Sequence, residues 1–313
     1  MEGKYLVTSF YRFFDVAESE LPALRDSLLS SGAALELRGQ IILASEGANG
    51  TVSGAQQQVE TFKRLLSAAL PAIVRPAAIE LDEGSILFKD SFSDRPPFQQ
   101  WTVKIRPEVV TSTIGPAGLA ADQPHYLTPA EWRERLRSDN EAIVLDTRNR
   151  YETSIGKFET AIDPGIDSFR DFEDTLKNSD IPRDKPVLIY CTGGIRCEKA
   201  EPILRRLGFR EVYQLHGGIL KFLEEFPEDA FKGECFVFDE RVALDQHLRP
   251  TSAYGFCPHC GQPASVRISC RRCGETAPVC GDCLVNPDRP QRRNSCSKNC
   301  ANILATQIRP AAQ

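Results

Sequence analysis

Residues 187–196 have the sequence Val-Leu-Ile-Tyr-Cys-Thr-Gly-Gly-Ile-Arg, and this stretch decides the fold. Its apolar start predicts a buried strand, and the residues that follow predict a helix over residues 196–207. Apolar runs at residues 142–146 and 212–215 alternate with further predicted helices, which indicates parallel βαβ units. Cys191 therefore lies at the carboxyl end of a buried strand, where open α/β sheets place their functional sites.

The loop after this strand is suited to holding a reactive thiol. Gly193 and Gly194 let the backbone curl so that its N–H groups point inward, and the next helix adds its positive N-terminal end. Such a cradle lowers the pKa of Cys191 and makes its sulfur nucleophilic at neutral pH, while Arg196 adds a fixed charge. The residues of this active-site loop are Thr192, Gly193, Gly194 and Ile195.

The length of the loop separates two classes of enzyme. Cysteine phosphatases usually have one residue more between the cysteine and the arginine, which makes room for phosphate. The four residues between Cys191 and Arg196 resemble the loop of rhodaneses, which carry a single sulfur atom as a persulfide. Asp146 and Arg148 resemble part of the rhodanese signature, and we expect them to form a buried supporting pair. Cys197 is more typical of a packed small residue than of a resolving thiol.

The first hundred residues predict a separate α+β domain. Apolar patterns indicate strands and helices in the order βαββαβ, which is typical of a ferredoxin-like sandwich. The predicted strands are residues 5–14, 35–44, 51–53 and 101–106, and the predicted helices are residues 20–29 and 55–66. Lys104 and Arg106 share one face of the last strand, either as a solvated outer face or as a basic face for RNA.

Two signals mark the boundary between this domain and the next. Residues 115–124 are rich in glycine, proline and alanine and predict a linker. Thr128 and Glu131 then form a capping box, with proline at the first helical position. We expect an α/β protein with a ferredoxin-like N-terminal domain, a central rhodanese-like domain with a parallel sheet, and a small cysteine-rich C-terminal domain. Their expected ranges are residues 1–115, 125–229 and 230–313.

Composition and charge limit the function classes. The chain has 313 residues, of which 41% are hydrophobic and 26% charged, and its net charge of −5 argues against a globally basic nucleic-acid binder. No apolar run approaches the roughly 18 residues that a membrane span needs, and the start of the chain lacks a signal-peptide core. We therefore expect a cytoplasmic protein without a membrane partner. From Thr251 onward, the chain has eight Lys and Arg but only three Asp and Glu. This basic tail is either a contact surface for RNA or an acidic partner, or an ordinary solvated surface.

Cysteine placement predicts metal sites. Eight of the eleven cysteines lie between Cys257 and Cys300, in four closely spaced pairs. In a reducing compartment such pairs are more often metal ligands than disulfides, and eight thiolates suffice for two tetrahedral zinc sites. The spacing leaves open whether the pairs bind sequentially or interleave. The predicted ligands are Cys257, Cys260, Cys270, Cys273, Cys280, Cys283, Cys296 and Cys300.

Over nearly its whole length, the chain resembles the rhodanese-related tRNA uridine hydroxylase family. The run Gly-Gly-Ile-Arg-Cys-Glu-Lys-Ala at residues 193–200 is far more specific than a generic rhodanese loop. Ala48, where isoleucine is usual, and Pro202 depart from the family pattern, and neither lies in the active-site loop. The other segments that carry the resemblance are residues 44–54, 146–149, 212–220 and 235–241.

The resemblance implies conversion of the wobble uridine of certain tRNAs to 5-hydroxyuridine, with molecular oxygen as co-substrate and the residue matching Cys191 essential. The sequence shows no glycine-rich dinucleotide motif for a flavin or nicotinamide, and its four histidines do not indicate a two-histidine iron site. We hypothesise that Cys191, or its persulfide, adds to uridine C6 and makes C5 electron-rich. The tRNA is expected to contact the N-terminal domain and the basic tail. The alternatives are a plain sulfurtransferase and a non-enzymatic binding module.

Overall fold

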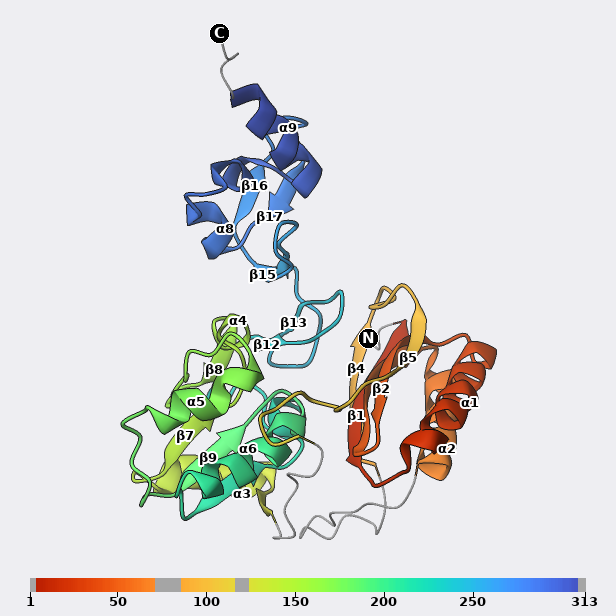
Figure 1. The fold of residues 1–313 in the computed structure, drawn as a ribbon, viewed down its shortest axis with the longest axis vertical. Coiled ribbons are helices and arrows are strands. Elements are labelled where there is room, and N and C mark those ends of the chain that lie inside the picture. Colours follow the sequence, from red (N-terminus) through yellow and green to blue (C-terminus); the bar gives the residue numbers. More distant parts are fainter. Residues whose placement is uncertain (1–3, 71–85, 116–123, 309–313) are drawn as a thin grey trace. The chain divides into compact units, whose positions relative to one another are not determined.

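A computed structural model describes residues 4–70, 86–115 and 124–308 (Figure 1). The chain divides into two compact units. The larger unit comprises Met1–Phe236 and Leu244–Arg249, and the smaller comprises Val237–Ala243 and Pro250–Gln313. Most of the predicted linker lies outside the described residues, so the expected domain boundaries stay a prediction. No helix in the described ranges combines the length and apolar character needed to cross a membrane.

The N-terminal part of the larger unit is a five-stranded sheet with two helices on one face (Figure 1). The strand order is β4-β1-β3-β2-β5, in which β5 runs parallel to β2 and the other neighbours are antiparallel. Its core packs the sheet against side chains such as Val59 and Phe62 of α2. The elements are β1 (Tyr5–Phe13), α1 (Leu21–Ala34), β2 (Arg38–Ala44), β3 (Gly47–Gly54), α2 (Gln56–Ala69), β4 (Lys89–Ser93) and β5 (Trp101–Ile105).

The predicted α+β sandwich is confirmed, and residues 101–105 form a strand as predicted, but this strand does not close the βαββαβ pattern. The strand that closes the βαββαβ pattern beside β1 is β4, not residues 101–106. The latter form β5, an additional edge strand next to β2. The sequence of β4 is Lys-Asp-Ser-Phe-Ser, whose single apolar residue leaves no alternating pattern to detect.

The second part of the larger unit is built on a parallel sheet with the order β6-β10-β9-β7, which confirms the predicted βαβ units. Residues 125–127 were not predicted as a strand. The strands are β6 (His125–Leu127), β7 (Ile143–Asp146), β9 (Val187–Tyr190) and β10 (Val212–Leu215). The helices are α3 (Pro129–Ser138), α4 (Arg150–Thr153), α5 (Phe172–Lys177), α6 (Ile195–Arg206) and α7 (Gly218–Glu225), and a short pair is formed by β8 (Gly156–Phe158) and β11 (Phe231–Gly233).

Two local sequence features of this part are the capping box before α3 and the proline within α6. The capping box at the start of α3 is confirmed, because the Thr128 hydroxyl accepts from the Glu131 N–H and the Glu131 carboxylate accepts from the Thr128 N–H. Pro202 lies inside α6, yet the helix continues through it to Arg206. Ala200 and Leu204 on either side are fully buried, so packing holds the helix across the missing N–H.

A cluster of aromatic rings forms the centre of this part. The ring of Phe158 lies 4.8 Å from that of Tyr190 and 4.9 Å from that of Phe222, measured between centroids. Trp132 and Phe231 each lie 5.5 Å away. These rings come from β8, β9, α7, α3 and β11. Phe158 thus links β9, the strand that precedes Cys191, to four other elements.

The smaller unit consists of short elements around the cysteine pairs. Its small apolar core includes Val279 and Ala264 together with cysteines. The elements are β14 (Gly255–Phe256), β15 (Pro263–Ala264), β16 (Arg267–Ser269), β17 (Thr276–Pro278), α8 (Gly281–Val285) and α9 (Lys298–Ile308). The pair β12 (Cys235–Phe236) and β13 (Ala243–Leu244) lies where the chain passes between the two units.

We expect Phe158→Ala to lower the free energy of unfolding by about 3–5 kcal/mol, because it leaves a cavity among four rings. Urea denaturation followed by circular dichroism measures the change. Ile162→Ala is the control, since the side chain of Ile162 is 41% exposed, and its expected loss is below about 1 kcal/mol. Equal losses in the two variants would contradict the role given to Phe158.

Candidate active site

Cys191 directly follows β9, where the chain turns into α6. The Gly194 N–H donates a hydrogen bond to the Cys191 sulfur at 3.0 Å. Gly194 has a φ of +102°, a region that favours glycine. The predicted curled loop with an inward N–H is thus present, and Cys191 is fully buried within it.

A second glycine, Gly218 at the start of α7, lets that helix pack directly against the loop. A β-carbon at Gly218 would lie 2.5 Å from the Cys191 carbonyl oxygen and 2.8 Å from the Gly194 nitrogen. The N–H of Ile219 donates to the Cys191 carbonyl at 3.0 Å, and the N–H of Leu220 donates to that of Thr192 at 3.1 Å. Both carbonyls are therefore turned toward α7 and away from the sulfur.

The surroundings of Cys191 favour its thiolate. Burial alone would raise the pKa of Cys191. A hydrogen bond with Cys197, the charge of Arg196 and the backbone N–H groups of Arg196 and Gly194 outweigh burial and lower the pKa to about 5. The opposite holds for Cys197, whose pKa is raised by burial and by the hydrogen bond with Cys191. At neutral pH the pair therefore consists of a Cys191 thiolate and a Cys197 thiol.

Arg196 does not face the sulfur alone, because its guanidinium forms two bonds with the Glu152 carboxylate. The distances are 2.5 Å and 2.8 Å, and both side chains are buried. This ion pair raises the pKa of Arg196 above its already high ordinary value. Arg196 is thus the fixed cation that the sequence predicted, but a carboxylate already balances its charge.

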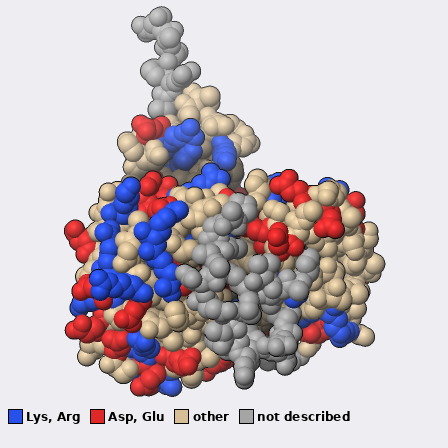
Figure 2. Space-filling model, turned by 60° about the horizontal axis from the view of Figure 1, so that its bottom comes forward, with Lys and Arg blue, Asp and Glu red and all other residues tan. Residues whose placement is uncertain are grey.

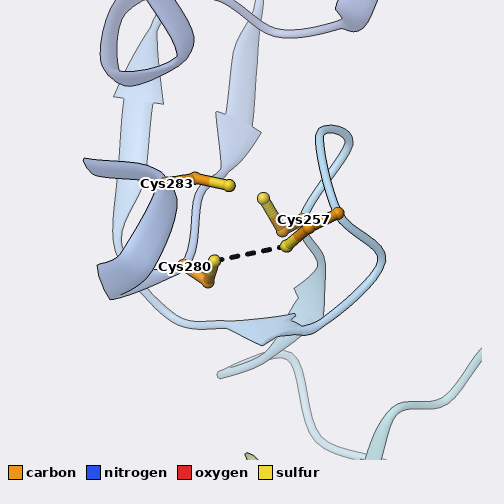
Figure 3. Close-up of side chains that lie close together, drawn as sticks. Cys257, Cys280 and Cys283 are labelled. Carbon is orange, nitrogen blue, oxygen red and sulfur yellow. Dashed lines mark hydrogen bonds between the residues drawn. The ribbon is translucent and has the colours of Figure 1, made fainter. Parts of the chain in front are cut away.

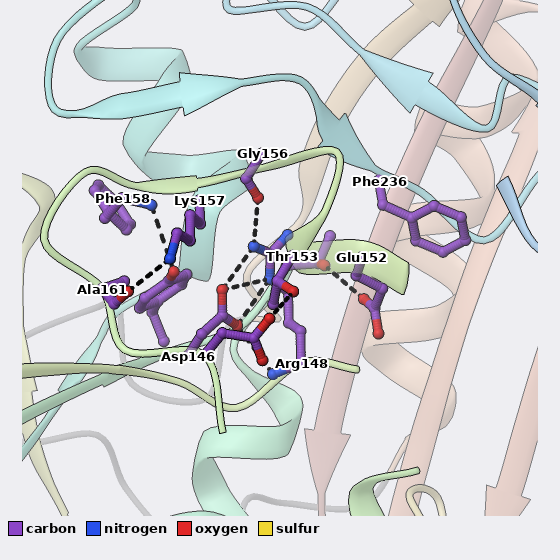
Figure 4. Close-up of polar contacts among 12 residues, drawn as sticks. Asp146, Arg148, Glu152, Thr153, Gly156, Lys157, Phe158, Ala161 and Phe236 are labelled. Carbon is purple, nitrogen blue, oxygen red and sulfur yellow. Dashed lines mark hydrogen bonds and ion pairs between the residues drawn. The ribbon is translucent and has the colours of Figure 1, made fainter. Parts of the chain in front are cut away.

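The expected pair of Asp146 and Arg148 is confirmed and is fully buried (Figure 4). The guanidinium bonds the carboxylate through Nε at 2.9 Å and through a terminal nitrogen at 2.7 Å. It also donates to the Gly156 carbonyl at 2.6 Å. The pair joins the end of β7 to β8, and the Arg148 guanidinium lies 5.6 Å from the ring centre of Tyr190, the residue before Cys191.

The N-terminal sheet contributes residues to this site that the sequence did not reveal. The Tyr11 hydroxyl of β1 and the Tyr126 hydroxyl of β6 donate to Glu198 on α6, at 2.9 Å and 2.8 Å. Lys199 on α6 forms an ion pair with Glu46 at 2.5 Å. The only advance signal for these contacts was that the segments holding Glu46 and Glu198 carried the family resemblance.

Two further residues near the site are held neutral. Burial lowers the pKa of His216 to about 4, with Lys89 and Lys221 adding to the effect, so its ring is uncharged at neutral pH. Burial raises the pKa of Cys235 to about 12. Neither is poised as a base or nucleophile at neutral pH.

The eight C-terminal cysteines form two groups, and their pairing is interleaved. The first and third pairs meet in one group and the second and fourth in the other, with the ligand atoms of each group within 4.8 Å of one another. Figure 3 shows Cys257, Cys280 and Cys283 directing their sulfurs toward a common point. The groups are Cys257, Cys260, Cys280 and Cys283, and Cys270, Cys273, Cys296 and Cys300.

The two groups fit a tetrahedral metal ion. A tetrahedral site with zinc–sulfur bonds of about 2.3 Å has sulfurs about 3.8 Å apart. The sulfurs of Cys296 and Cys300 are separated by 3.7 Å, and those of Cys260 and Cys280 by 3.4 Å. Arg272 and Arg292 donate to sulfurs of the two groups, as suits a tetrathiolate with excess negative charge. His259 lies outside both groups and hydrogen-bonds to Ser295, as predicted for a non-ligand.

Charge alone does not mark an RNA surface. Figure 2 shows Lys and Arg next to Asp and Glu on the face in view rather than a field of one sign. Arg133 and Arg137 both pair with Asp229, for example. Lys104 is exposed beside the buried Val103, as the alternating pattern predicted, and it donates to Gln40. The assignment of tRNA contact to the N-terminal domain and the tail stays a prediction.

Three family models match successive parts of the chain. A model described as a UPF0176 acylphosphatase-like domain matches residues 5–109. A rhodanese-like domain matches residues 128–225, and a rhodanese C-terminal model matches residues 232–301.

Curated relatives extend this similarity to the whole chain. A protein of Bdellovibrio bacteriovorus named tRNA uridine(34) hydroxylase is 41% identical over 300 residues, which cover 96% of this chain and 81% of the relative. Proteins with the same name are 39% identical in a Synechocystis strain and 38% identical in Legionella pneumophila. These matches cover 88% and 78% of this chain and 96% and 91% of the relatives.

We expect the thiolate absorbance of Cys191, taken as the difference between the wild-type protein and Cys191→Ser, to persist from neutral pH down to about pH 5 and to fade below it. Cys197→Ala should raise the midpoint, because it removes a hydrogen bond to the thiolate. Cys235→Ala, which removes a buried thiol that stays protonated, should not. A midpoint near the ordinary thiol value of about 8.5 in the wild-type protein would show that the loop does not lower the pKa of Cys191.

Proposed function

This chain belongs to the tRNA uridine(34) hydroxylase family, and from that membership we propose that it hydroxylates the wobble uridine of tRNA at C5. The observation that carries the proposal is the 41% identity over 96% of the chain. The site supports it, because a buried thiolate lies at the end of a parallel strand, where such sheets hold their ligands.

The proposed catalytic residue is Cys191. Its thiolate adds to C6 of the uracil ring, so that a carbon–sulfur bond forms and the electron pair of the C5–C6 double bond moves toward C5 and the C4 carbonyl. Arg196 and the loop residues Thr192, Gly193, Gly194 and Ile195 hold the sulfur in place, and Asp146 and Arg148 support them. The persulfide of Cys191 is the alternative nucleophile for the same addition.

The addition prepares C5 for oxidation. An electron-rich C5 accepts one oxygen atom, and we propose molecular oxygen as its source. The second oxygen atom then leaves as water, which consumes two electrons and two protons from a reductant outside this chain. Loss of the C5 proton and departure of the Cys191 sulfur restore the aromatic ring and the thiolate.

Rhodanese-type sulfur transfer is the second candidate, because four residues separate Cys191 from Arg196, as in loops that carry a persulfide. In that case Cys191 would accept sulfur from thiosulfate or another persulfide and pass it to a thiol. The matched flanking domains favour the hydroxylase, since bare sulfur transfer needs only the central domain.

We propose structural zinc for the two cysteine groups of the C-terminal unit. Few apolar residues surround them, so metal binding would supply much of the stability of this unit. We also retain the division into residues 1–115, 125–229 and 230–313. The proposed partner is tRNA, and we place the reaction in the cytoplasm because tRNA is its substrate.

In cells that lack this gene, we expect the wild-type protein to restore 5-hydroxyuridine derivatives in tRNA and Cys191→Ala to leave them at the level of the empty vector. Mass spectrometry of digested tRNA measures both. Cys235→Ala is the matched control, because Cys235 is also a buried cysteine but lies outside the loop, and it should restore them fully. If no variant changes the modification while purified protein accepts sulfur from thiosulfate, the sulfurtransferase replaces the hydroxylase.

The interleaved pairing predicts a specific pattern of zinc loss. The purified wild-type protein should contain two zinc ions per chain, one for each group. The double variant Cys257→Ser with Cys280→Ser alters one group and should retain one zinc ion. Cys257→Ser with Cys270→Ser alters both groups and should retain none. Elemental analysis counts the metal, and sequential pairing would reverse the results of the two double variants.

A further inference from the structure

Lys89 lies beside the active-site loop although it belongs to the N-terminal sheet. It is the first residue of β4 and pairs with Ser9 of β1, which places its side chain on the same sheet face as Tyr11. Its Nζ lies 4.8 Å from the centre of the Tyr11 ring. A β-carbon at Gly193 would lie 3.6 Å from Lys89 Cε and 3.9 Å from Nζ. The ammonium is thus in contact range of the loop that holds Cys191.

This ammonium is buried without a hydrogen-bond acceptor among the described residues. Lys89 as a whole is 3% exposed. A buried charge is costly unless a counter-charge compensates it. Three other buried cations of the larger unit each have a carboxylate. These pairs are Arg196 with Glu152, Arg148 with Asp146, and Lys199 with Glu46.

The groups that face Lys89 leave two candidates for its counter-charge. The anions that raise its pKa are Cys191 and Glu198 on α6, while burial lowers the value to about 8. Tyr11 on β1 stays protonated, because burial raises its pKa further above the ordinary value. His216 after β10 is neutral at neutral pH. Glu198 already accepts the hydroxyls of Tyr11 and Tyr126, whereas the loop of Cys191 is within contact range of the ammonium, so we take the Cys191 sulfur as its counter-charge.

We propose that Lys89 is a positioning residue for Cys191: the N-terminal domain supplies the positive charge that holds the buried sulfur as a thiolate. Arg196 also stabilises the thiolate, but its guanidinium is paired with Glu152. The N-terminal domain is then part of the catalytic unit and not only a surface for substrate. The proposal concerns the resting thiolate, so it holds whether Cys191 attacks uridine or carries sulfur.

The test is the pH titration of Cys191 in the full-length protein, without tRNA. The thiolate absorbance is measured as the difference from the same protein carrying Cys191→Ser, which cancels the other cysteines. Lys89→Met should move the midpoint upward by about one pH unit, a tenfold loss of thiolate below the midpoint, because a nearby cation is lost. Lys89→Arg should keep most of the wild-type value. Lys177→Met, which removes an exposed lysine of α5, should keep all of it.

An unchanged midpoint in a folded Lys89→Met protein would overturn the proposal. If that variant does not fold, the proposal is tested by titrating Lys89 itself, in proteins that keep this lysine. The Lys89 signal is followed by NMR of lysine side chains labelled with ¹³C, in the wild-type protein and in Cys191→Ser. Loss of the thiolate should lower the Lys89 midpoint, since linked charges shift each other equally. An equal midpoint in both proteins would show that Lys89 does not sense Cys191.

Discussion

The hydrogen bond from the Gly194 N–H to the Cys191 sulfur depends on a turn with no room for side chains. Gly194 needs a positive φ to direct its N–H inward, and Gly218 must lack a β-carbon for α7 to reach the loop carbonyls. Once these two backbones are in contact, α7 takes up the carbonyls and the free N–H groups are left for the sulfur. The ring of Phe158 and the guanidinium of Arg148 both lie against Tyr190, the residue that precedes Cys191.

Compensation of buried charge explains why the site extends beyond one domain. Arg196 and Arg148 are each matched to a carboxylate within the rhodanese-like part. Helix α6, however, carries Glu198 and Lys199, two buried charged residues whose partners include residues of the N-terminal sheet. The two parts of the larger unit are therefore joined by polar contacts at the same helix that begins with the catalytic loop.

A structural feature could be predicted from the sequence where neighbouring residues cause it, and could not where distant segments cause it. The strand before Cys191 and the loop after it were predicted, because an apolar run and two glycines act within ten residues of each other. Strand β4 was not, since Lys89 is held in a strand by its neighbour β1 rather than by its own sequence. Cysteine spacing predicted eight ligands, but pairs of similar spacing do not show which two pairs share a metal ion. The burial of Glu198 and the position of Lys89 depend on contacts between two domains. No pattern in the neighbouring sequence predicts such contacts.

The complete burial of Cys191 also bears on damage by oxidants. A thiolate that persists down to about pH 5 is in the form that hydrogen peroxide converts to sulfenic and then to irreversible sulfinic acid. Reaction with a small oxidant requires access as well as ionisation. With 0% of the residue exposed, the rate of such oxidation is set by how often the fold opens over the sulfur, and not by the reactivity of the sulfur itself. The enclosure thus lets the protein keep a strongly activated thiolate where oxidants are present.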